Sequence, residues 1–434
     1  MGKTRLSPPD FKERTRALPI KAMGAVPEVV LPLLQHTGAP CGPEVAAGDN
    51  VKAGTLIARS KEYVSAPIHS SVSGSVKAIE EKPHPILGRY KAIVIASDGR
   101  DEQDSSIQDR KDTASLSADE IRKIIRDCGI VGLGGAAFPT HIKLKPPKEK
   151  PIDTFILNAA ECEPFLTADH RLMLEKPERI IEGMLIAMKV LGVKRAIIAI
   201  EENKPDAIEV MKKIVDNDSI KVVSLKSFYP QGAEKQLIKT ILRREVPPGG
   251  LPFDVGCVVN NVATCFAIYE AVYKNKPLYE RVITVSGKIV KNPGNILVRV
   301  GTKVGDIIEF CGGLSEEAAK VIVGGPMMGI AQYTLEVPVI KGTSGIIVFG
   351  KSQVKAPLSQ ACIRCGRCIE VCPMGLNPSA IAQAIEKGRF DLAEEYNVLD
   401  CVECGICSYV CPGNRDIVGL VKLAKQKLKN KERK

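Results

Sequence analysis

The cysteines near the C-terminal end of the sequence constrain its fold more than any other feature. Eight of the 14 cysteines fall into two copies of the spacing C-x2-C-x2-C-x3-C-P. The first copy runs from Cys362 to Pro373, and the second runs from Cys401 to Pro412. In such a run, three thiolates on one loop hold three corners of an iron–sulfur cubane, and the fourth cysteine ligates the other cluster. The repeat therefore predicts two [4Fe–4S] clusters and one-electron transfer.

The same rule divides the eight cysteines into two ligand sets. The first cluster takes Cys362, Cys365, Cys368 and Cys411. The second cluster takes Cys401, Cys404, Cys407 and Cys372. Structural zinc is the alternative, but a zinc site needs only four ligands and normally takes two pairs from separate turns. Small buried side chains are expected for the six isolated cysteines, which are Cys41, Cys128, Cys162, Cys257, Cys265 and Cys311.

Length and composition narrow the class of protein. With 434 residues, 44% of them hydrophobic, the chain can build about three domains. No run of about 18 apolar residues occurs, and no apolar segment follows the basic N-terminus, so we expect neither a transmembrane helix nor a secretory signal. We therefore expect the chain to stay in the cytoplasm, where its 14 cysteines would be kept as thiols. A chain without Trp and with 4% aromatic residues offers no stacking surface, so no nucleic acid partner is expected.

The sequence before the cysteines divides into three further units. Residues 26–100 hold short apolar runs broken by Gly and Pro, which predict a β-rich domain. Its segments Gly48–Gly54 and Ser65–Val76 resemble the barrel-sandwich hybrid of biotinyl and lipoyl domains. No Lys lies between Ile68 and Gly74, so a scaffold or docking role is expected instead of a swinging arm. Residues 98–114 are polar and predict a linker.

The central unit, residues 116–275, alternates strands with helices. A capping box begins it at Ser117, and strands are expected at 154–157, 195–200 and 221–225. Helices are expected between and after these strands, at 177–191, 205–215 and 233–242. This order predicts a Rossmann-like α/β domain with a parallel sheet.

The last two units complete a multidomain α/β protein. Residues 276–350 resemble the SLBB β-grasp domain, a type whose usual role in electron-transfer proteins is structural. Residues 351–425 form the ferredoxin-like α domain that carries the cysteines.

A glycine-rich loop, Gly132–Lys143, opens the central domain. It contains G-x-G-x-x-A, but a helix precedes it where a dinucleotide-binding motif needs a strand, and Pro139 interrupts the helix that should follow. Taken alone, the loop offers free N–H groups that can cradle a phosphate, with Lys143 adding charge. An ordinary turn is the alternative.

The loop pattern G-x-G-G-A-x-F-P-T-x-x-K resembles the flavin loop of the FMN-binding, NADH-oxidising subunit of respiratory complex I. Two later segments, Asn158–Pro164 and Val259–Thr264, are similar to that subunit's N-A-D-E-S-E-P and V-N-N-V-E-T. The order of the four domains resembles the peripheral subunits of Rnf membrane complexes, which are ferredoxin:NAD oxidoreductases. That resemblance covers nearly the whole chain.

The resemblance implies a set of FMN contacts. The phosphate and the near side of the isoalloxazine would be held by Gly132, Gly134, Gly135 and Lys143. The ring or ribityl chain would be hydrogen-bonded by Asn158, Asn260, Asn261 and Thr264. Leu133, Ala160 and Ala263 replace an Arg, an Asp and a Glu of complex I, so the chain departs from the family pattern at these three positions.

The resemblance also implies where NAD(H) binds. The contacts would be made by Phe138, Glu161 and Glu163, with Glu201 and Glu202 as weaker candidates. No side-chain acid or base is implied, because the cofactors carry the chemistry.

As a function, the resemblance implies electron transfer between NAD(H), FMN and two [4Fe–4S] clusters in ferredoxin:NAD oxidoreduction coupled to Na⁺ or H⁺ movement. The chain would lie on the cytoplasmic face of the membrane, with other Rnf subunits as partners and ferredoxin reached indirectly. Two alternatives stay open. One is a soluble flavin/iron–sulfur reductase of the cobalamin-reductase type, and the other is an electron relay with no nucleotide site.

Overall fold

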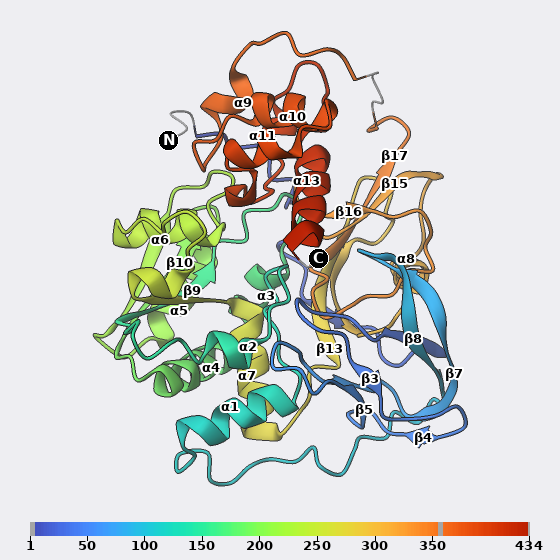
Figure 1. The fold of residues 1–434 in the computed structure, drawn as a ribbon. Coiled ribbons are helices and arrows are strands. Elements are labelled where there is room, and N and C mark those ends of the chain that lie inside the picture. The colour runs from blue at the N-terminus through green and yellow to red at the C-terminus, as the bar shows by residue number, and fades with distance from the viewer. Residues whose placement is uncertain (1–4, 355–358, 433–434) are drawn as a thin grey trace.

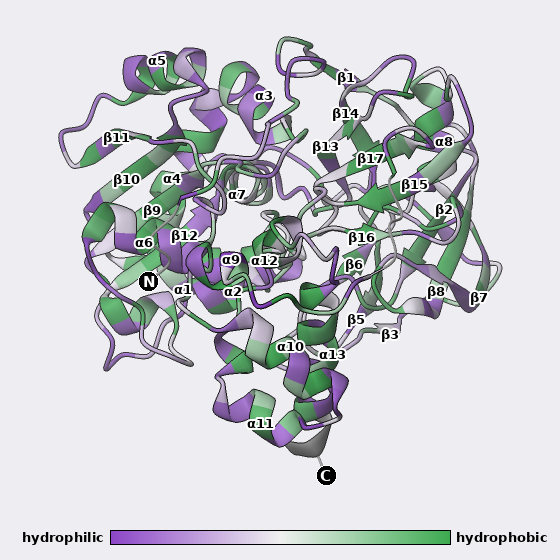
Figure 2. Ribbon diagram, turned by 90° about the horizontal axis from the view of Figure 1, so that it is seen from above, coloured by the Kyte–Doolittle hydropathy of each residue, from purple (hydrophilic) through white to green (hydrophobic). Residues whose placement is uncertain are grey.

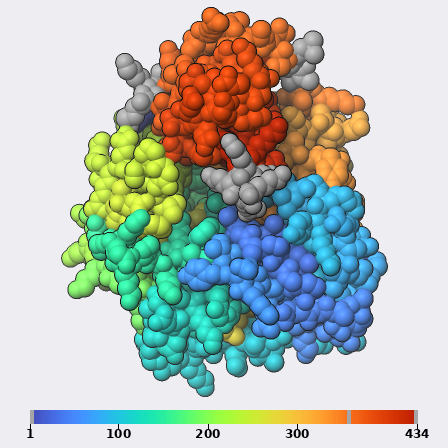
Figure 3. Space-filling view, in the orientation of Figure 1, coloured from blue at the N-terminus to red at the C-terminus, as the bar shows by residue number. Residues whose placement is uncertain are grey.

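A computed structural model describes residues 5–354 and 359–432 and contains the four expected units (Figure 1). The α/β domain lies at the left of the view, the N-terminal β domain at the lower right, and the cysteine-bearing helices at the top. Figure 3 shows the C-terminal domain seated across the units below it. No helix among the described residues has both the length and the apolar character that crossing a membrane requires.

The N-terminal domain consists of two small antiparallel sheets, as expected. One sheet has the order β2 (Glu28–Pro32), β8 (Gly88–Ser97), β7 (Gly74–His84) and β4 (Asn50–Val51). The other has the order β3 (Gly42–Pro43), β5 (Leu56–Arg59) and β6 (Ile68–His69). Their inward-facing side chains form one core, which includes Leu31, Ile57, Ile68, Ile93 and Ile95.

The α/β domain has a four-stranded parallel sheet. Its order is β11 (Ile220–Leu225), β10 (Arg195–Glu201), β9 (Thr154–Ala159) and β12 (Cys257–Asn261). The strands are continuous apolar runs because helices cover both faces of the sheet, and the apolar colouring of β10 in Figure 2 follows that burial.

The helices of this domain are α1 (Ala118–Asp127), α2 (Thr140–Lys143), α3 (Ala168–Glu175), α4 (Pro177–Leu191), α5 (Pro205–Ile214), α6 (Glu234–Leu242), η1 (Pro252–Val255) and α7 (Val262–Lys274). Three of them, α4, α5 and α6, lie close to the predicted ranges 177–191, 205–215 and 233–242, whereas α2, α3, η1 and α7 were not predicted. Helix α1 begins with the predicted capping box between Ser117 and Glu120. Helices α4 and α7 pack closely at Gly183, where an added Cβ would lie 1.8 Å from the carbonyl oxygen of Cys265.

A six-stranded mixed sheet forms the core of the SLBB region. Its order is β1 (Ile20–Ala22), β14 (Gly294–Arg299), β13 (Glu280–Ser286), β17 (Gly345–Gly350), β15 (Ala318–Val323) and β16 (Ile330–Ala331), with α8 (Val304–Phe310) packed against it. Strand β1 precedes the first predicted domain, and it was not expected because it has three residues and no alternating pattern. The N-terminal segment also pairs Leu6 with Tyr229, so it joins two domains.

The predicted linker is bound along its length. Arg110 donates its backbone N–H to Tyr273 and its guanidinium to the Val272 carbonyl and the Asn275 side chain. Gln103 bridges to Ala53 in the N-terminal domain. These contacts hold the segment against two domains, so it is not a free tether.

Short helices make up the C-terminal domain. They are α9 (Arg367–Glu370), α10 (Pro378–Glu386), α11 (Phe390–Glu395), η2 (Val398–Asp400), α12 (Ile406–Tyr409) and α13 (Ile417–Glu432). Helices α10, α11 and α13 share an apolar core that includes Ile381, Ile385, Val398 and Val421.

A buried lysine lies where three domains meet. Lys341 is 1% exposed and donates its ammonium to the carbonyl oxygens of Pro67, at 2.6 Å, and Gly129, at 2.7 Å. Burial lowers the pKa of Lys341 to about 8. Arg281 donates to the Lys341 carbonyl and, at 3.4 Å, to that of Leu133, so the glycine-rich loop is tied to the same junction.

We expect Gly129→Ala to destabilise the protein far more than the matched Gly192→Ala. Both glycines have positive φ, +64° and +70°, but an added Cβ at Gly129 would lie 2.3 Å from the Pro67 oxygen, whereas Gly192 has open space. Gly192→Ala should cost about 1 kcal/mol, and Gly129→Ala at least about 3 kcal/mol. Thermal unfolding of the two variants measures this difference, and equal midpoints would contradict it.

Candidate functional site

The two cysteine loops share one backbone conformation. Arg364 and Glu403 occupy equivalent positions with φ of +57° and +55°, and the glycines two residues later have φ of +79° and +77°. A short helix follows each loop and carries the third cysteine, Cys368 in α9 and Cys407 in α12. The sequence repeat is therefore also a structural repeat.

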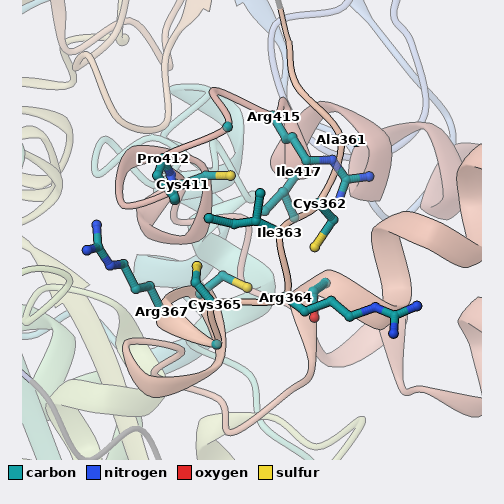
Figure 4. Close-up of a pocket in the computed structure, with 14 residues that line it drawn as sticks. Ala361, Cys362, Ile363, Arg364, Cys365, Arg367, Cys411, Pro412, Arg415 and Ile417 are labelled. Carbon is teal, nitrogen blue, oxygen red and sulfur yellow. The ribbon is translucent and has the colours of Figure 1, made fainter.

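Four cysteines surround one pocket, as the spacing predicts for the first cluster. They are Cys362, Cys365, Cys368 and Cys411. Figure 4 shows the side chains of Arg364 and Arg367 extending away from this pocket. Three ligands from one loop and one from the other fit a cubane shared between the repeats.

The other four cysteines also gather at one place. Cys372 interacts electrostatically with Cys401, Cys404 and Cys407. Burial raises the pKa of the Cys404 and Cys407 thiols to about 12, so bound iron would have to keep them ionised. Among the described residues, no three His, Cys, Asp or Glu side chains converge on a point that could hold a single metal ion.

All 14 cysteines have free thiols. Of the six isolated ones, five are buried as expected, namely Cys41, Cys128, Cys257, Cys265 and Cys311. Cys162 is half-buried instead, and its sulfur accepts the N–H of Gly232 at 3.3 Å.

The glycine-rich loop is a closed turn with an open tip. It is closed by a bridge between Val131 and Pro139 and by the hydrogen bond from the Gly132 N–H to the Phe138 carbonyl at 2.8 Å. Gly134 and Gly135 are exposed at the tip, and their N–H groups have no acceptor within the described part of the chain. This arrangement fits the expected donor-rich loop.

Three asparagines lie at the carboxyl edge of the parallel sheet, next to the loop. Asn158 and Asn261 are register partners on β9 and β12, and a Cβ added at Gly134 would lie 3.3 Å from that of Asn261. Asn260 is 4% exposed, and its Nδ2 has no hydrogen-bond partner among the described residues. Because an unpaired buried donor is costly, this amide fits a polar ligand such as a flavin.

The start of helix α7 fixes the loop from behind. Asn261 caps the helix by accepting the N–H of Thr264 at 3.3 Å, and the Thr264 hydroxyl accepts the N–H of Leu133 at 2.9 Å. Asn261 also donates to Asp169 at 2.5 Å. Burial, with a contribution from Glu161, raises the pKa of Asp169 to about 7. Sequence reasoning missed Asp169 because it lies in none of the matched motifs.

Lys143 lies at the end of the loop in an ion pair. Its ammonium is 2.6 Å from Glu234 at the start of α6, and both side chains are about one-third exposed. An anion bound here would compete with Glu234 for this lysine. Phe138, the expected nicotinamide contact, is half-buried.

The structure gives the four candidate glutamates partners within the chain. Glu161 accepts the N–H of Asp169 at 2.8 Å, and Glu163 accepts the N–H groups of Met327 and Met328 at 3.1 and 2.9 Å.

The other two candidate glutamates, Glu201 and Glu202, differ in exposure. Glu201 is buried in an ion pair with Lys204 at 3.3 Å, and Glu202 is exposed and accepts the N–H of Ser227 at 3.3 Å. A contact of any of the four with NAD(H) stays a prediction.

A second lysine that the sequence did not single out lies in this region. Lys12 is 3% exposed and donates to the carbonyl oxygens of Glu161, at 2.6 Å, and Leu166, at 2.5 Å. Its partners lie about 150 residues later, so no local pattern could reveal it.

The C-terminal domain contacts the α/β domain through the second cysteine loop and through the end of the first cysteine copy. The Tyr229 hydroxyl donates to the Cys404 carbonyl at 2.7 Å, and the Gln236 amide donates to the Pro373 carbonyl at 2.8 Å. Near the start of the first copy, Ile363 is 70% exposed. Viewed from above, α9 and α12 lie side by side over the centre of the molecule (Figure 2).

Comparisons with known proteins match this chain in four successive segments. They are the barrel-sandwich hybrid domain of RnfC at residues 3–100, the Nuo51 FMN-binding domain at 125–270, the SLBB domain at 282–331 and the 4Fe-4S dicluster domain at 358–412. The predicted fold class is thereby confirmed.

Curated relatives match over nearly the whole chain. One belongs to the proton-translocating ferredoxin:NAD(+) oxidoreductase complex of Clostridium ljungdahlii and is 51% identical over 96% of this chain and 92% of its own. Another belongs to the Na(+)-translocating ferredoxin:NAD(+) oxidoreductase complex of Acetobacterium woodii. It is 46% identical over 99% of this chain and 97% of its own. An NAD+-reducing [NiFe]-hydrogenase structure shares the fold, with a TM-score of 0.50, 20% identity and coverage of 73% of this chain and 61% of its own.

Burial makes Glu163 a pH-dependent element of stability. It raises the pKa of Glu163 from 4.5 to about 7, so between these values the folded protein keeps a proton that the unfolded chain releases. The free energy of unfolding should therefore fall by about 3 kcal/mol as the pH rises through this window. In Glu163→Gln the free energy of unfolding should no longer fall over this pH range. In Glu202→Gln, a change at an exposed position, it should fall as in the parent protein. Unfolding midpoints at about pH 5 and about pH 8 test the difference.

Proposed function

The chain belongs to the RnfC family of proteins from ion-translocating ferredoxin:NAD(+) oxidoreductase complexes, and we propose that it transfers electrons between NAD(H), FMN and two [4Fe–4S] clusters in such a complex. The observation that carries the proposal is the contact between Tyr229 and Cys404, which seats one cysteine loop on the FMN-binding type of domain. As part of a membrane-associated complex, it would lie peripherally on the cytoplasmic face, with other subunits as partners and ferredoxin reached through them.

The eight clustered cysteines would hold the iron. The pocket formed by four of them supports the first ligand set, and the mutual approach of Cys372, Cys401, Cys404 and Cys407 supports the second. Because Cys404 of the second set accepts the hydrogen bond of Tyr229 in the α/β domain, the second set would hold its cluster beside that domain.

The loop and the sheet edge would hold FMN. The free N–H groups of Gly134 and Gly135, with Lys143, would bind the phosphate, and the unpaired amide of Asn260 would bind a polar atom of the ring or ribityl chain. The chemistry supplied by FMN, once held there, would be hydride exchange with the nicotinamide and single-electron exchange with the clusters. The chain itself supplies position and hydrogen bonds, and no side-chain acid or base.

Cofactor analysis with NADH addition tests the proposal. Purified without oxygen, each chain should hold about eight irons, about eight sulfides and about one FMN. NADH should then bleach the flavin absorbance. Unchanged flavin absorbance would indicate a relay without a nucleotide site, and zinc as the only metal would contradict the cluster assignment. Recovery with the soluble fraction alone would favour a soluble reductase.

We expect Lys143→Glu to lower FMN content, because a second carboxylate beside Glu234 would repel the phosphate. Loss of one charge-assisted contact should weaken FMN binding by about tenfold or more. Lys150→Glu is the matched control, since Lys150 is also ion-paired, with Asp254, but lies outside the loop. FMN per chain and the fluorescence-detected affinity measure the effect, and equal flavin content in both variants would refute this phosphate site.

A further inference from the structure

We propose that the β15–β16 hairpin of the SLBB region and Tyr229 together position the second cysteine loop against the α/β domain. The loop clamp, as we name it, comprises Glu163, Tyr229 and residues 325–328. This inference rests on the proposed function and adds the residues that fix the relation between the flavin side and the nearer cluster.

Tyr229 forms one side of the clamp. It is 3% exposed, and its hydroxyl lies 2.7 Å from the carbonyl oxygen of Cys404 and 3.4 Å from the carboxylate of Glu163. A phenol has one proton to donate, and the Cys404 oxygen is the nearer acceptor. Val371 and Ile406 pack around Tyr229 in an apolar cluster, which shields the hydrogen bond between Tyr229 and Cys404 from water.

The hairpin forms the other side. Glu163 accepts the N–H groups of Met327 and Met328, and a Cβ added at Gly325 would lie 2.2 Å from its carboxylate oxygen. On its opposite side the hairpin touches the cysteine loop, because a Cβ added at Gly405 would lie 2.5 Å from the Met327 carbonyl oxygen. Residues of three domains thus meet around Cys404 and Gly405.

These contacts act on the cluster ligand through its backbone. The Tyr229 hydroxyl presents the positive end of its dipole to the Cys404 carbonyl, and hydrogen bonds near a cluster tune its reduction potential. A nearby donor favours the reduced cluster, which carries the additional negative charge. The clamp also fixes the distance across which an electron must tunnel. Tyr229 and Gly325 are therefore positioning residues, and the hairpin needs no ligand for this role.

Tyr229→Phe is the first test, with Tyr273→Phe as its control. The control removes a half-buried hydroxyl, which donates to Glu182 at 2.9 Å far from the cysteine loops. In protein purified without oxygen, Tyr229→Phe should lower the midpoint potential of one of the two clusters in a dithionite titration followed by electron paramagnetic resonance. Amide hydrogen exchange over residues 401–411 should be about fivefold faster, the factor expected for one net hydrogen bond.

Gly325→Ala is the second test, with Gly305→Ala as its control. At Gly305 an added Cβ would meet its nearest atom at an ordinary 3.5 Å. Gly325→Ala should change the midpoint potential of the same cluster and speed amide hydrogen exchange over residues 401–411. Both test variants should also slow the reduction of that cluster by NADH. The inference is overturned if Tyr229→Phe and Gly325→Ala match their controls in potential and exchange. Failure of NADH to reduce the parent protein would instead refute the proposed function, because the dithionite titration needs no nucleotide.

Discussion

Buried cations that bond backbone carbonyl oxygens of other domains determine how this chain is assembled. Lys12, Lys341 and Arg281 are each at most 5% exposed. Each donates to carbonyl groups that belong to a distant part of the sequence. Because a buried charge without partners is very costly, these side chains are satisfied in this one arrangement of domains and in few others. Apolar packing alone would discriminate less sharply between arrangements.

The same cations place the candidate site. Arg281 bonds the carbonyl of Leu133, whose N–H is bound by Thr264, so the glycine-rich loop is held at the same residue from two domains. Lys12 brings the N-terminal segment to Glu161 at the carboxyl edge of the parallel sheet. The open tip of the loop therefore faces a rigid edge, and the N–H groups of Gly134 and Gly135 are left without acceptors among the described residues.

Features set by neighbouring residues could be predicted from the sequence, whereas contacts between distant residues could not. The cysteine spacing predicted which four thiols share a pocket, because three of them lie on one loop and the paired repeat supplies Cys411 as the fourth. Helix α4 was predicted at Pro177–Leu191 from its apolar period and flanking residues. Strand β1 and the contacts of Tyr229 and Glu163 depend on partners more than 60 residues away, and neither period nor composition marks them.

The pairing of β1 with β14 sets an order for synthesis and folding. Residues 20–22 lie beside residues 295–297 in a parallel pair, so the first strand has no neighbour while most of the chain is being translated. At ordinary ribosomal speeds that interval is on the order of ten to sixty seconds. The six-stranded sheet must wait until β17, which ends at Gly350, has been translated. Assembly of this sheet is consequently a late event, which requires β1 to stay unpaired until β14 has been made.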